Sequence, residues 1–182
     1  MAALDPLENK LNEIFAKNLP ALPEGGKKFL VTYLPYINLI LGVLVLLSVL
    51  SLWRWATAAN DLVNNLNSLS EAYGGATITA GDRLGPVIWL ALITLAVQGA
   101  LYVASYPGTK ARKKSGWNFM FYALLVNVAY GVVMVFSAYG GLGSLFGSLI
   151  GTSIGLYLLF QIRASYSTDK VAKKSAKTAK KA

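Results

Sequence analysis

Four long apolar runs without a charged residue divide the chain. They cover residues 29–53, 84–106, 117–139 and 143–162. About 20 consecutive apolar residues in a helix are enough to cross the hydrocarbon core of a bilayer, which is about 30 Å thick. The pattern therefore predicts an all-helical integral membrane protein, a four-helix bundle with one span in each run. The membrane domain as a whole is predicted over residues 29–163.

The residues before the first run form an amphipathic arm, residues 1–28. Its apolar residues recur at spacings of three and four: Leu4, Leu7, Leu11, Ile14 and Phe15. This spacing is typical of a helix with one apolar face, and Glu8 is predicted to point away from that face. Pro20 and Pro23 end the predicted helix. The arm is too short and too charged to span, so we expect it on the membrane surface or against the ends of the bundle.

The segment after the first run, residues 54–83, is polar but carries one apolar stripe. The stripe consists of Leu62, Val63, Leu66, Leu69 and Tyr73. It predicts an amphipathic helix near residues 56–73, which either continues the first span or folds back from it. Gly74 and Gly75 follow directly and predict its end.

Lysine and arginine are distributed unevenly among the connecting segments. The chain has 17 of them and a formal net charge of +9. With four alternating crossings, all but Arg54 and Arg83 lie in the arm, in the loop 107–116 or after the last run, from Arg163 onward through the tail 164–182. Cytoplasmic loops carry the excess of basic residues. We therefore predict that both termini and the loop 107–116 are cytoplasmic and that residues 54–83 lie outside.

The basic loop and the Lys-rich tail are predicted to contact anionic lipid headgroups. The residues expected to do so are Lys110, Arg112, Lys113, Lys114, Lys170, Lys173 and Lys174. The tail has little apolar surface and is predicted to be disordered. It lacks interleaved aromatic residues, so we expect any nucleic-acid binding to be weak and sequence-blind.

Four glycines recur at every fourth position of the last run: Gly143, Gly147, Gly151 and Gly155. On a helix such a row forms a shallow oblique groove of small residues, which permits close helix packing. The partner is either another helix of the same chain, which we favour, or a neighbouring subunit.

Polar side chains inside the runs supply the one candidate site for a solute. Asn38, Gln98, Asn127 and Thr152 come from the four predicted spans and are expected at similar depth. Two interpretations are open. Hydrogen bonds between helices are favoured, and binding of a small polar solute or passage of water or an ion is the alternative.

The composition limits the chemistry that the chain can perform. It has no cysteine and no histidine, and the predicted spans contain no charged residue. We therefore predict no metal site, no cofactor and no enzymatic activity, and proton-coupled transport is disfavoured. The predicted function is a structural or partner-binding membrane subunit, alone as a homo-oligomer or with another subunit. A small-solute or ion channel or transporter is the alternative. The composition fits a multi-pass protein of a prokaryotic plasma (inner) membrane.

Overall fold

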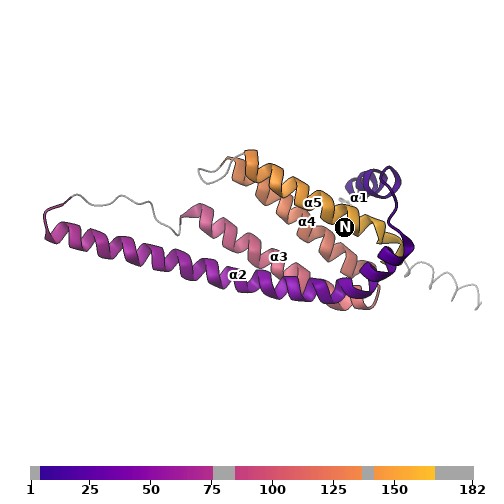
Figure 1. Ribbon diagram of the computed structural model, residues 1–182, viewed down its shortest axis with the longest axis horizontal. Helices are drawn as coiled ribbons and strands as arrows, with labels where there is room; N and C mark the ends of the chain where they lie inside the picture. Colours follow the sequence, from indigo (N-terminus) through magenta and orange to yellow (C-terminus); the bar gives the residue numbers. More distant parts are fainter. Residues whose placement is uncertain (1–4, 76–84, 137–141, 167–182) are drawn as a thin grey trace, which may run out of the picture.

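The computed structural model describes residues 5–75, 85–136 and 142–166, without the side chains of residues 142 and 144. The elements in chain order are α1 (Asp5–Asn12), the π-helix η2 (Glu13–Lys17), α2 (Glu24–Ala72), α3 (Pro86–Lys110), α4 (Lys114–Val135), α5 (Leu142–Gln161) and the 3-10 helix η3 (Arg163–Tyr166). All of them are helical, which confirms the all-helical part of the predicted fold class for the described ranges (Figure 1).

Three of the helices, α2, α3 and α4, are long and apolar enough to cross a membrane. The described apolar stretch of α5, Leu145–Gln161, is shorter than these three helices. The four helices pack in chain order, α2 against α3, α3 against α4, and α4 against α5. These lengths support a membrane protein. The crossing by α5 and the orientation in the bilayer stay predictions.

Helix α2 continues without a break through the predicted span and the predicted outer helix. Its 49 residues give it a length of about 74 Å, and it extends well past the start of α3 (Figure 1). Its end is a left-handed glycine cap. Gly74 has φ +69°, its amide donates to Glu71 O at 3.1 Å, and the amide of Gly75 donates to Ser70 O at 2.8 Å. The outer segment therefore continues the span, and the predicted end at Gly74 is confirmed.

The crossing of α2 and α3 depends on two isolated glycines. A Cβ atom added to Gly42 would lie 2.9 Å from the amide nitrogen of Val103 and 3.0 Å from Gly99 O. One added to Gly99 would lie 2.8 Å from Leu46 Cγ. Larger residues at either position would push the two backbones apart.

The turn between α3 and α4 is tighter than the sequence predicted. Pro107 does not end α3, which runs on to Lys110 and is closed by Arg112 in a left-handed conformation with φ 53°. The amide of Lys113 donates to Gly108 O at 2.8 Å and completes the cap. Gly108 and Gly116 then meet backbone to backbone across the turn.

The best-packed core lies at the end of the bundle that carries this turn, which we call the arm end. Trp117 and Phe121 of α4 pack against Phe160 of α5, with ring centroids 5.2 Å and 5.9 Å apart. Trp117 also donates its indole N–H to Leu159 O at 2.9 Å. The arm packs on this core through Phe15, whose ring lies parallel to that of Phe160. Of the two predicted locations for the arm, the structure places it against the end of the bundle.

Candidate functional site

The four polar residues predicted to form one layer contact other helices at three separate places, and at one of them Asn38 also donates to the sulfur of Met120 in α4 at 2.6 Å. Asn127 of α4 donates to the Thr152 hydroxyl of α5 at 3.0 Å. Asn38 of α2 donates to the Ser105 hydroxyl of α3 at 3.3 Å. Gln98 of α3 donates to Ala123 O of α4 at 3.4 Å. Only Asn127 and Thr152 are therefore bonded to each other, and each of the four side chains takes part in a hydrogen bond between helices. This arrangement lends no support to a shared solute site.

Replacing Asn127 with leucine is expected to weaken the α4–α5 contact by about 0.6 kcal/mol, the usual size of such a bond between membrane helices. The measurement is the free energy of unfolding in mixed micelles. A double-mutant cycle with Thr152→Val isolates the pair, because the two substitutions should be less than additive. Full additivity would show that the bond does not contribute.

Among the described residues, the glycine row of α5 contacts the rest of the chain only near the arm end. A Cβ atom added to Gly155 would lie 2.8 Å from Leu124 Cδ2 of α4. At Gly143, Gly147 and Gly151 it would meet no described atom within 4 Å. These three positions leave a bare strip on α5 that faces away from α4.

The basic loop lies at the arm end, and its four cations have different surroundings. Lys110 donates to the Tyr106 hydroxyl at 3.2 Å, and this bond raises the pKa of the lysine. Lys114 lies 3.1 Å from a carboxylate oxygen of Glu8, whereas Arg112 and Lys113 are exposed. The three tail residues, Lys170, Lys173 and Lys174, lie outside the described residues.

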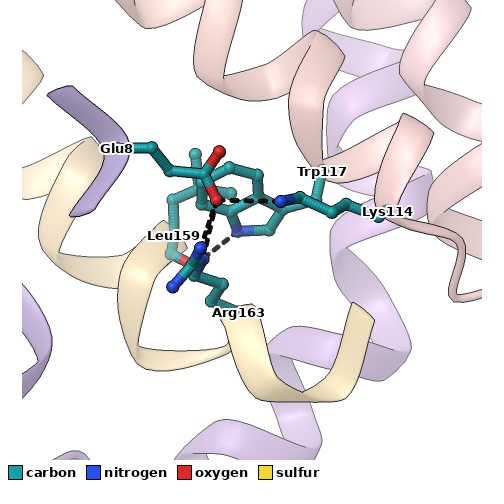
Figure 2. Close-up of polar contacts among 5 residues, drawn as sticks. All are labelled: Glu8, Lys114, Trp117, Leu159 and Arg163. Carbon is teal, nitrogen blue, oxygen red and sulfur yellow. Dashed lines mark hydrogen bonds and ion pairs between the residues drawn. The ribbon is translucent and has the colours of Figure 1, made fainter. Parts of the chain in front are cut away.

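Glu8 is the centre of an ion cluster that the sequence did not predict. Its carboxylate pairs with Lys114 and accepts from both Nε and Nη2 of Arg163, the former at 2.9 Å (Figure 2). Arg163 also lies over the ring of Trp117, 5.8 Å from its centroid. Glu8 is only 6% exposed, so the prediction that it points away from the apolar face is wrong. The spacing of Glu8 in the sequence already indicated its position on that face, because Glu8 follows Leu4 by four residues and precedes Leu11 by three.

Backbone carbonyls hold the rest of the arm against α5. Gln161 donates to Phe15 O at 3.1 Å, and its side-chain oxygen accepts from the Leu22 amide at 3.2 Å. The hydroxyl of Tyr157 donates to Pro20 O at 2.8 Å. These bonds satisfy carbonyls in a segment that has no helical partners of its own. The described part of the arm is therefore held at two places, at Glu8 and at residues 15–22.

Tyr166 closes the arm end from the C-terminal side. Its side chain is fully buried, and its hydroxyl has no hydrogen-bond partner among the described residues. Burial raises the pKa of this phenol to about 12, although the nearby positive charge of Arg112 acts in the opposite direction. Tyr166 therefore stays neutral at physiological pH.

An apolar groove of about 260 Å³ separates α2 from α5 near the arm end. Its lining residues are Leu30, Leu34, Ile37, Asn38, Leu41, Tyr102, Met120, Leu124, Gly155, Leu158, Leu159 and Ile162. Ile37 and Leu41 are more than a third exposed, so the groove is open along this side. The amide of Asn38 is turned toward Ser105, which leaves a lining that is almost wholly hydrocarbon.

Comparisons of the chain with protein-family models, with curated proteins and with solved structures find no match.

Proposed function

We propose that the protein is a non-enzymatic membrane subunit that assembles with a second copy of itself through the outer part of α2. In this arrangement four helices cross the plasma membrane of a prokaryote, both termini are cytoplasmic, and residues 54–73 project outside. The positive-inside distribution of lysine and arginine supports this orientation. The observation that carries the proposal is the continuity of α2 to Ala72. From Trp53 to Ala72 the helix extends about 28 Å beyond the predicted span.

The projecting segment carries the heptad pattern of a coiled coil, in which two positions, a and d, face the partner helix. Its a positions are Ala59, Leu66 and Tyr73, and its d positions are Trp55, Leu62 and Leu69. We call these six residues the outer seam. The five large ones are 41% to 88% exposed. An apolar repeat of 3.5 residues fits a left-handed pair of helices.

The charges of the segment favour pairing with an identical helix. Arg54, Asp61 and Glu71 all fall at c or f positions, away from the seam. The flanking e and g positions are uncharged: Ala56, Ala58, Val63, Asn65, Ser70 and Ala72. Two copies can therefore pair in parallel without opposing like charges, as two proteins oriented in one membrane would.

The contact area is sufficient for a pair that is already confined to a membrane. Burying five large side chains on each copy removes about 1,000 Å² of surface in total, near the lower limit for specific complexes. Tethering both copies in one bilayer raises their effective concentration. The segment also continues a membrane helix, so it does not need to nucleate on its own.

Disulfide cross-linking in liposomes tests the seam, and the absence of native cysteine makes single-cysteine variants unambiguous. At a low protein-to-lipid ratio, oxidised Leu66→Cys is expected to give several-fold more covalent dimer than Asn64→Cys. Position 64 is exposed on the same helix but at an f position, so it is the matched control. Equal yields would contradict the proposal. Cross-linking at Gly147→Cys without any at Leu66→Cys would move the interface to the bare strip of α5.

A further inference from the structure

A second hollow, of about 150 Å³, lies at the arm end and is lined by cations. Its lining residues are Lys27, Lys28, Val31, Thr32, Arg112 and Ser165. The lysines come from the first turns of α2, and Arg112 comes from the α3–α4 turn. Three positive side chains from two separate elements therefore converge on one small space.

This cationic hollow continues the line of the apolar groove between α2 and α5. On α2, Lys27, Val31, Leu34 and Asn38 follow one another at spacings of four and three, so they share one helix face. Lys27 precedes Leu34 by about 10 Å along the axis. Near the end of α5, Ile162 lines the groove, and Ser165, which bonds to it through the backbone at 2.9 Å, lines the hollow. The two spaces therefore adjoin along this row of α2, with Lys28 and Thr32 lying about 100° further around the helix.

The charges of the hollow are not neutralised by the described residues. Among the described residues none of Lys27, Lys28 and Arg112 forms an ion pair. Arg112 also occupies a left-handed position where glycine is the usual residue, at a cost of about 1 kcal/mol. A lysine cluster with no acidic partner next to a hydrocarbon groove has the complementary chemistry of an amphiphile with an anionic head.

We propose that the groove and the hollow together bind one anionic phospholipid of the cytoplasmic leaflet. One acyl chain lies in the groove, and the phosphate lies against Lys27, Lys28 and Arg112. The groove is narrow, open to the side and smaller than the pockets of about 300–1,000 Å³ that hold compact ligands, which suits a chain that enters laterally from the bilayer. Guanidinium and ammonium groups bind phosphate oxygens with charge-assisted hydrogen bonds.

Native mass spectrometry of the full chain, released from nanodiscs of equal parts phosphatidylglycerol and phosphatidylcholine, tests the site. The wild type is expected to retain one phosphatidylglycerol in preference to phosphatidylcholine. Arg112→Gly and Lys27→Gln are each expected to lower that preference about fivefold. Arg112→Gly also relieves the left-handed backbone, so loss of fold does not explain its effect. Ile37→Trp, which fills the open side of the groove, is expected to lower retention of both lipids.

Lys113→Gln is the matched control, because Lys113 is an exposed cation in the same turn that does not line the hollow. It should leave the preference unchanged. An equal loss in Lys113→Gln, no preference in the wild type, or unchanged retention in Arg112→Gly and Lys27→Gln would each overturn the proposal. The site rests on the membrane placement proposed above but not on the outer seam. Adding Leu62→Asn to the Leu66→Cys variant should abolish its cross-linking and leave the lipid preference unchanged, so a failure of the seam and a failure of the lipid site can be told apart.

Discussion

Gly116→Ala is expected to prevent α3 and α4 from closing their turn. The single added methyl group would overlap the amide nitrogen of Thr109 and would lie 2.8 Å from the Cα of Gly108. Both neighbours are backbone, so no side-chain rotation relieves the clash. Forcing extra atoms into a packed site costs about 1–3 kcal/mol when side chains can adjust, and we expect at least the upper value here. The measurement is the free energy of unfolding in mixed micelles.

Gly147→Ala is the matched control for that substitution. It makes the same chemical change inside a helix, but at a position where a Cβ atom meets no described neighbour within 4 Å. It is expected to leave stability unchanged or to raise it by less than about 1 kcal/mol, since alanine is the better helix former. Equal stability of the two variants would show that the α3–α4 turn opens freely.

Glu8→Ala is expected to release the arm from the bundle. The substitution removes the carboxylate that pairs with the partly buried guanidinium of Arg163 and with Lys114. Removing one member of a buried pair costs about 3–5 kcal/mol. Lys114 remains 44% exposed, so we expect the substitution to weaken the contact between the arm and the bundle by about 1–3 kcal/mol. The readout is tryptic cleavage after Lys10 and Lys17, whose rate should rise about tenfold as the arm opens more often.

Glu13→Ala supplies the comparison for Glu8→Ala. Glu13 also lies in the arm and also pairs with a lysine, Lys17, but both side chains are about two-thirds exposed. Exposed ion pairs of this spacing contribute about 0.3–0.5 kcal/mol to stability, so the rate of tryptic cleavage should change little. If both variants are cleaved at the same rate, charge pairing at Glu8 does not hold the arm.

Features encoded by neighbouring residues could be predicted from the sequence. The uncharged runs predicted α2, α3 and α4, because apolar length alone determines which segments are able to span a bilayer. The Gly74 and Gly75 pair predicted the end of α2, because a left-handed cap favours a residue without a Cβ atom. The apolar spacing of the arm predicted a helix with one buried face.

Features that depend on distant partners could not be predicted. Arg163 lies 155 positions from Glu8, so no local pattern joins them. The glycine row showed that α5 is able to approach another helix closely but not which one, and within the described chain only Gly155 meets a neighbour. The closest approach of α2 and α3 occurs instead at Gly42 and Gly99, single glycines that form no repeat.

The continuity of α2 has a mechanical consequence. A single helical rod runs from Gly42 to the outer seam at Leu66, with neither a loop nor a proline between them, since the proline inside α2 is Pro35. The packing of Gly42 against α3 therefore sets the direction in which the seam faces around the helix axis. Gly42 lies about 36 Å from Leu66 along the helix. A twist imposed at either end of the rod is carried as torque to the other.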